Sequence, residues 1–181
     1  MSISVSRITI LGSFLLAAAI YLTMVLFTLP QIAQFANGAM AFDMRPSGYS
    51  VQEAKHFLIS LGQEGRQFYL SQQLLLDVFY PALLGVFLFG SLNKLASLAS
   101  GTWRMVLIGA AIISILAIGL DYAENISIAM MLLSADVQAG LVQTASFFTI
   151  AKSVITTAVF VVLLIGAINQ VLAVRLREPR L

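Results

Sequence analysis

The sequence predicts an all-α membrane protein: a bundle of four transmembrane helices with an amphipathic helix in the first outer loop. Of its 181 residues, 60% are hydrophobic and 10% are charged, against about 45–50% and about 25% in soluble domains. Four apolar runs reach the ~20 residues that a membrane-spanning helix needs. Between the first two runs, hydrophobic residues recur at helical spacing in a polar segment. We expect residues 1–181 to form a single transmembrane domain.

The four spanning helices are expected at about residues 8–29, 66–92, 103–133 and 144–174. The apolar run of the first is longer than the 7–15 residues of a signal peptide, so this segment is interpreted as a retained helix. Pro30 is expected to end it, because proline cannot continue a helical hydrogen-bond ladder.

An outer-loop helix is expected at about residues 50–61. Ser50 and Glu53 have the spacing of a capping box, which marks a helix N-terminus. Apolar side chains then recur on one helical face: Ala54, Phe57, Leu58 and Leu61. We expect this helix to lie at the membrane surface, and Gly62 and Gly65 to allow a bend before the second span.

The basic residues predict the orientation, because Lys and Arg concentrate on the cytoplasmic side. One flank holds Arg7, Lys94, Arg104, Arg175, Arg177 and Arg180, and the other holds Arg45, Lys55 and Arg66. We therefore expect both termini to be cytoplasmic, in a bacterial inner membrane.

Ionisable residues interrupt three of the apolar runs. A rise of 1.5 Å per residue places Asp77, Asp121, Glu124 and Lys152 about 24–34 Å from the cytoplasmic flank. Charged groups in a bilayer usually face the bundle interior and one another. The candidate ligand-binding or polar cluster comprises Asp77, Tyr80, Asp121, Tyr122, Glu124, Asn125 and Lys152, with Glu64 and Arg66 just outside the membrane.

The charges of this cluster do not balance, because three acids accompany one lysine. One carboxyl holds a proton, or Arg66 joins the cluster from the loop, or a bound cation completes it. Two structural alternatives stay open. The polar side chains can simply join helices by hydrogen bonds, and Lys152 can extend to the outer interface.

The composition excludes several kinds of site. The chain has no cysteine, so disulfides and thiolate metal sites are excluded. His56 is the only histidine, so a site with several histidines from one chain is excluded too. We expect no metal and no cofactor. The basic residues form no stripe, so we expect no nucleic-acid partner.

Three segments resemble an uncharacterised group of bacterial membrane proteins with four helices and a long first outer loop. They are Leu61-Gly62-Gln63-Glu64-Gly65-Arg66 with Tyr69, Leu76-Asp77-Val78-Phe79-Tyr80-Pro81, and Asp121-Tyr122-Ala123-Glu124-Asn125. The resemblance implies the four-helix fold and no activity.

Three function classes follow from the cluster. The first is a lipid- or amphiphile-binding or accessory protein with an outer-leaflet acidic pocket, whose partners are the bilayer, a lipid or amphiphile, or another membrane protein or a second copy. The second is an intramembrane enzyme on a lipid-like substrate, with Asp121 or Glu124 as general base. The third, placed last, is a proton- or cation-coupled carrier, because residues 108–116 and 159–165 offer no polar path.

Overall fold

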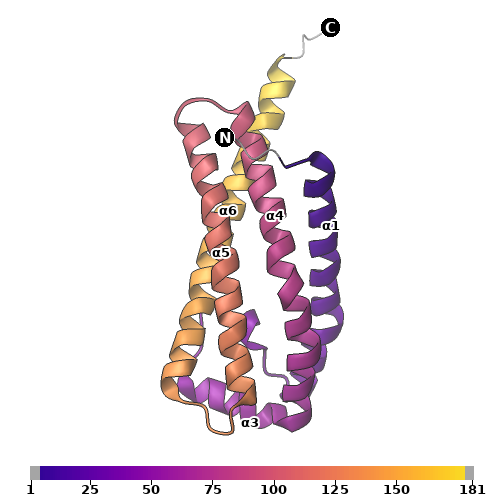
Figure 1. Ribbon diagram of the computed structural model, residues 1–181, viewed down its shortest axis with the longest axis vertical. Coiled ribbons are helices and arrows are strands. Elements are labelled where there is room, and N and C mark those ends of the chain that lie inside the picture. The colour runs from indigo at the N-terminus through magenta and orange to yellow at the C-terminus, as the bar shows by residue number, and fades with distance from the viewer. Residues whose placement is uncertain (1–4, 178–181) are drawn as a thin grey trace.

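The computed structural model describes residues 5–177, which contain helices and no strand. Arg180, assigned above to the cytoplasmic flank, lies outside the described residues. Four long helical stretches run side by side, and a shorter helix lies across one end of the bundle (Figure 1). We call this end the α3 end. The opposite end, where α1 begins and α6 ends, is called the basic end.

The first stretch comprises α1 (Arg7–Thr23), the π-helical turn η1 (Met24–Thr28) and α2 (Leu29–Phe35). The chain stays helical past Pro30, so the prediction that Pro30 ends the helix is wrong. Pro30 lies in the first turn of α2, directly after η1. A proline at that position gives up an N–H that has no regular helical partner.

The short 3-10 turn η2 (Phe42–Met44) precedes α3 (Val51–Phe68), which begins with the Ser50–Glu53 capping box. Gly62 breaks α3 with φ 64° and ψ −175°, a conformation that is essentially restricted to glycine. The π-helical turn η3 (Tyr69–Gln73) then leads into α4 (Leu74–Leu98). The break turns the chain from the end of the bundle into its second long helix.

The last two helices are α5 (Gly101–Leu133) and α6 (Ala139–Arg177). The start of α5 lies within two residues of the prediction, whereas α4 runs six residues beyond it and α6 starts five residues before it. The connections between these helices are therefore shorter than expected.

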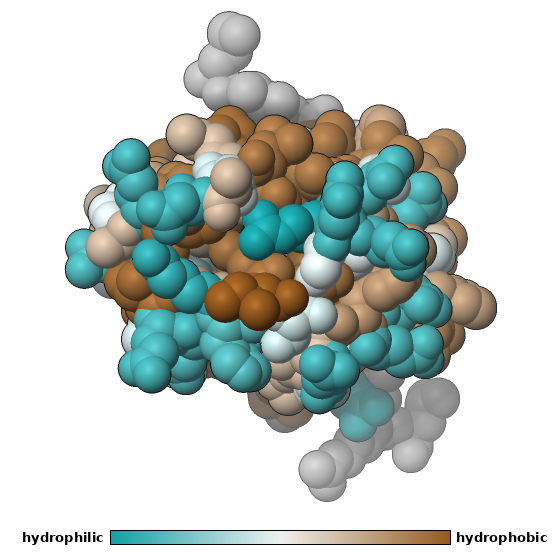
Figure 2. All heavy atoms as spheres, turned by 90° about the horizontal axis from the view of Figure 1, so that it is seen from below, coloured by the Kyte–Doolittle hydropathy of each residue, from teal (hydrophilic) through white to brown (hydrophobic). Residues whose placement is uncertain are grey.

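Four helical stretches are long and apolar enough to cross a membrane: residues 7–35, 51–98, 101–133 and 139–173. Large apolar side chains stay exposed along them, among them Leu116 and Leu164. The face of the α3 end is different, because hydrophilic side chains surround a small central apolar patch there (Figure 2). The molecule thus has apolar sides and a polar end.

The buried apolar side chains form two separate cores. One lies at the α3 end and includes Phe42, Phe57 and Ile128. The other lies towards the basic end, between α4, α5 and α6, and includes Leu88 and Leu107. Along α4 and α5, the stretches between these two cores carry the acidic residues of the predicted cluster.

Candidate functional site

A layer of hydrogen-bonded polar side chains separates the two apolar cores. We call it the polar layer. Its members are Thr28, Asp43, Tyr69, Gln73, Asp77, Asp121, Glu124, Asn125, Thr149 and Lys152. They come from all four long helical stretches and from the loop before α3. Every one of the long helices therefore contributes to one polar network.

Lys152 of α6 is the cation of the polar layer. Its ammonium group lies 3.2 Å from Asp121 Oδ1 and forms a second ion pair with Glu124. The hydroxyl of Thr149 donates to Glu124 Oε1 at 2.5 Å. The Lys152 side chain is only 15% exposed and Glu124 is fully buried. Lys152 therefore points into the bundle, and the alternative in which it extends to the outer interface is wrong.

Gln73 joins α4 to the first helical stretch and to the loop. Its amide group donates to Asp77 Oδ2 at 3.0 Å and to Asp43 Oδ2 at 3.2 Å, and its carbonyl oxygen accepts from the Thr28 hydroxyl. Thr28 lies in η1 and Gln73 in η3, so the two π-helical turns meet here. Such turns are frequent at functional sites.

Asp43 and Tyr69 are members of the layer that the sequence did not indicate. The Tyr69 hydroxyl donates to Asp43 Oδ1 at 2.5 Å, and the Tyr69 side chain is fully buried. Asp43 comes from the first loop. Aspartate is common in loops, so the position of Asp43 in the sequence does not indicate that it belongs to the site. Tyr69 follows Arg66 at helical spacing, and in the sequence only the resemblance to the bacterial four-helix group includes it.

Pro81 explains why Tyr122 and Asn125 belong to the site. Because proline has no N–H, the carbonyl of Asp77, four residues earlier, lacks its helical donor. The Asn125 side-chain amide donates to that carbonyl at 3.3 Å, and the Tyr122 hydroxyl donates to the Val78 carbonyl at 2.7 Å. Polar side chains of α5 thus satisfy the backbone that Pro81 opens in α4.

Four predicted site residues lie outside the polar layer: Tyr122, which binds only the Val78 carbonyl, and Glu64, Tyr80 and Arg66. Glu64 is exposed on α3, and the Tyr80 ring stacks on Tyr21 of α1 with centroids 5.9 Å apart. Arg66 does not descend into the cluster. It donates to the Leu58 carbonyl, one turn before the break at Gly62, and to carbonyls at the end of α5, including Ser134 at 2.9 Å. Arg66 therefore caps two helix ends.

The loop before α3 closes the layer from the α3 end. The Tyr49 amide donates to the Ser146 hydroxyl at 2.9 Å. A side chain at Gly48 would meet that same hydroxyl at 2.6 Å, and the φ of Gly48 is 80°. Burial raises the pKa of the Tyr49 hydroxyl above its ordinary value, so this group stays neutral. A glycine at position 48 lets the loop approach α6 closely.

The polar layer holds more acids than bases. Asp43, Asp77, Asp121 and Glu124 share it with a single lysine. Within residues 5–177, no three His, Asp or Glu side chains are arranged to hold a metal ion. Arg66 does not balance these acids, because its donors hold the Leu58 carbonyl and the carbonyls at the end of α5. The cavity beside Asp121, between Pro81 and Thr156, has a volume of about 10 Å³, roughly that of one water.

Comparisons with protein-family models, with curated proteins and with solved structures find no match to this chain. The resemblance to the bacterial four-helix group therefore stays a prediction.

Proposed function

We propose that the chain is a multi-pass protein of a bacterial inner membrane with its α3 end on the outer side. The basic residues support this orientation. Arg7, Lys94, Arg104 and Arg175 gather at the basic end, against Arg45, Lys55 and Arg66 at the α3 end. Because positive residues are retained in the cytoplasm, the basic end is cytoplasmic.

The function best supported is the binding of an amphiphile from the outer leaflet. The observation that carries it is a cavity of about 700 Å³ between α3 and the end of α5, within the range of about 300–1,000 Å³ typical of ligand pockets. Gln63, Arg66 and Gln67 give it a polar, cationic side, whereas Ile59, Leu70 and Leu133 give it an apolar side. This pairing suits an anionic headgroup with an attached hydrocarbon chain.

The proposed pocket lies next to the polar layer and not inside it. Arg66 lines the pocket while its donors hold the ends of α3 and α5. Tyr69, three residues further on, is bound to Asp43 of the layer. We propose that the polar layer fixes the walls of the pocket, so that its rigid hydrogen bonds preorganise the binding site.

Catalysis by a carboxylate of the layer has less support. A general base must lie within hydrogen-bond reach of its substrate, whereas Glu124 is fully buried and bound to Lys152 and Thr149. The cavity beside Asp121 is too small for a lipid-like substrate. A carrier has less support still, because the core between the layer and the basic end is apolar.

Lipid extraction and mass spectrometry of the purified protein test the proposal. Leu133→Trp places a bulky ring in the pocket, and Leu116→Trp places the same ring on an exposed part of α5 that does not line it. We expect one amphiphile to co-purify with the wild type and with Leu116→Trp, and to be lost in Leu133→Trp. Co-purification of a stable membrane protein, with no amphiphile in any sample, would instead support the accessory role.

A further inference from the structure

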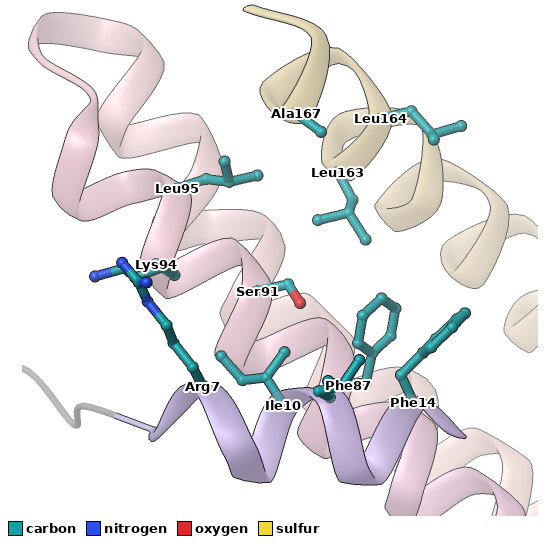
Figure 3. Close-up of a pocket in the computed structure, with 11 residues that line it drawn as sticks. Arg7, Ile10, Phe14, Phe87, Ser91, Lys94, Leu95, Leu163, Leu164 and Ala167 are labelled. Atoms are coloured by element: carbon teal, nitrogen blue, oxygen red, sulfur yellow. The ribbon is translucent and has the colours of Figure 1, made fainter. Parts of the chain in front are cut away.

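A second groove lies near the basic end, on the side of the molecule where α1 and α6 both border α4. Its volume is about 480 Å³. The floor is α4 and the two walls are α1 and α6 (Figure 3). The apolar lining residues are Ile10, Leu11, Phe14, Phe87, Leu95, Leu163, Leu164 and Ala167. The rings of Phe14 and Phe87 pack with centroids 4.9 Å apart at the end towards the middle of the bundle.

The two charged groups of this groove lie at its other end, whereas the Ser91 side chain lies between the two ends (Figure 3). Arg7 is the first residue of α1 and Lys94 lies in the last turns of α4, and both line the groove. Figure 3 shows both side chains extending away from the Phe14–Phe87 end. Both are exposed, and within the described part of the chain neither forms an ion pair. Two cations at the mouth of an apolar groove are complementary to an anionic group that is attached to a hydrocarbon chain.

We propose that this groove binds an anionic phospholipid of the cytoplasmic leaflet. Its phosphate lies between Arg7 and Lys94, and one acyl chain lies along the apolar walls towards Phe14. Basic pockets between transmembrane helices on the cytoplasmic side are a known setting for anionic headgroups. A free phosphate would leave the apolar walls unused, and a zwitterionic lipid would bring no net negative charge to the two cations. The site lies at the opposite end of the molecule from the proposed outer pocket and shares only the membrane insertion with it.

The shape of the groove is fixed by close helix contacts. A Cβ at Gly90 would lie 2.7 Å from Ile10 Cγ1, so α1 sits tightly on α4 beside Arg7. A Cβ at Gly166 would lie 3.0 Å from Leu95 and 3.1 Å from Leu107, so α6 sits tightly on α4 and α5 beside Leu163. Both walls are thus held against the floor. A preformed groove loses little freedom when a chain enters it.

Native mass spectrometry from nanodiscs tests the proposal, with phosphatidylglycerol and phosphatidylcholine of identical acyl chains as probes. We expect the wild type to retain phosphatidylglycerol in preference to phosphatidylcholine. The double variant Arg7→Gln/Lys94→Gln should lower phosphatidylglycerol retention by roughly 10- to 30-fold, given the contribution of one basic residue near an anionic surface. Inorganic phosphate should not displace the lipid, because it cannot use the apolar walls.

Matched variants separate a built site from general surface charge. Arg104→Gln/Arg175→Gln removes two exposed charges from the same end outside the groove and should retain the lipid. Ala167→Trp fills the groove and should lose it, whereas Ala158→Trp, exposed on α6 but outside the groove, should keep it. Circular dichroism and size-exclusion profiles show that each variant is folded.

Three outcomes would overturn the proposal. The first is equal retention of the two lipids by the wild type. The second is an equal loss of phosphatidylglycerol in Arg7→Gln/Lys94→Gln and in Arg104→Gln/Arg175→Gln. The third is a dimer that disappears in Ala167→Trp while lipid retention is unchanged, because the groove would then be covered by a second copy. The outer pocket is untouched by all these substitutions, so its own test with Leu133→Trp succeeds or fails independently.

Discussion

At the scale of single residues, Lys152 is the group on which the polar layer depends. It compensates both Asp121 and Glu124, and Glu124 has no exposure to water. Removal of one partner of a buried ion pair leaves an uncompensated charge and costs about 3–5 kcal/mol. We therefore expect Lys152→Met to lower the free energy of unfolding in detergent by about that amount, and a second substitution, Glu124→Gln, to restore part of it.

Lys55→Met is the matched control for this experiment. Lys55 also pairs with a carboxylate, Asp136 at 3.5 Å, but the two side chains are 49% and 90% exposed. Exposed pairs contribute little because water already solvates both charges. Equal losses of unfolding free energy in Lys152→Met and Lys55→Met would contradict the conclusion that the polar layer depends on Lys152.

Some members of the polar layer can be predicted from the sequence and others cannot. Asp121, Glu124 and Lys152 stand out because a charge within an apolar run has no water to solvate it and must find a partner. Asp43 and Gln73 do not stand out, since a loop and a helix end normally carry polar residues. Only the folded chain brings them to Asp77. Sequence therefore predicts the charged centre of the site and misses its polar shell.

At the scale of elements, the contact between α4 and α5 is organised by Pro81. We expect Asn125→Ala to cost about 0.6 kcal/mol and at most about 1.7 kcal/mol, the range for hydrogen bonds between membrane helices. In a Pro81→Ala background the cost should be smaller, because alanine at this position would supply a backbone N–H to the Asp77 carbonyl. A double-mutant cycle of unfolding free energies measures this coupling.

Asn93 gives a control for the cycle. Its side-chain amide also donates to a carbonyl four residues earlier, that of Phe89 at 2.8 Å, but it lies towards the basic end of α4. Asn93→Ala should show no coupling with Pro81→Ala, since distant sites are usually additive. An additive result for Asn125 as well would mean that the Asp77 carbonyl does not depend on Asn125.

Helix centres were predictable, and so were ends with a local signal, such as the Ser50–Glu53 capping box of α3. Length and hydropathy locate the four runs, whereas the other ends depend on contacts between segments far apart in the sequence. The continuation of the first stretch to Phe35 is one case. A Cβ on Gly65 would lie 2.8 Å from the Phe35 Cβ, so α2 and α3 pack closely. That tertiary contact has no counterpart in the local pattern around Pro30.

At the scale of the whole molecule, two apolar cores with a polar layer between them form a bundle with one polar end and one basic end. The layer joins all four long helical stretches, so it determines their relative depth. The outer pocket and the basic groove each lie at one end of this bundle. Both proposals therefore depend on the same arrangement of the chain across the membrane.

The arrangement can be tested directly because the chain contains no cysteine, so single-cysteine variants carry no background label. Gln52→Cys lies exposed on α3, and Ser97→Cys lies exposed at the basic end of α4. With a membrane-impermeant maleimide, we expect Gln52→Cys to react in spheroplasts and Ser97→Cys to react only after lysis. Positive residues at the basic end favour this direction of insertion.

Leu116→Cys completes the test, because residue 116 lies about 18 Å along α5 from Arg104, near the middle of a ~30 Å hydrocarbon core. Its side chain is 55% exposed in the isolated molecule, so only surrounding lipid can protect it. A maleimide reacts with thiolate, which does not form in hydrocarbon, so this variant should stay unlabelled until the protein is denatured. Rapid labelling in intact membranes would show that α5 does not span the bilayer. Labelling of Ser97→Cys in spheroplasts would instead reverse the orientation and place the basic groove in the outer leaflet.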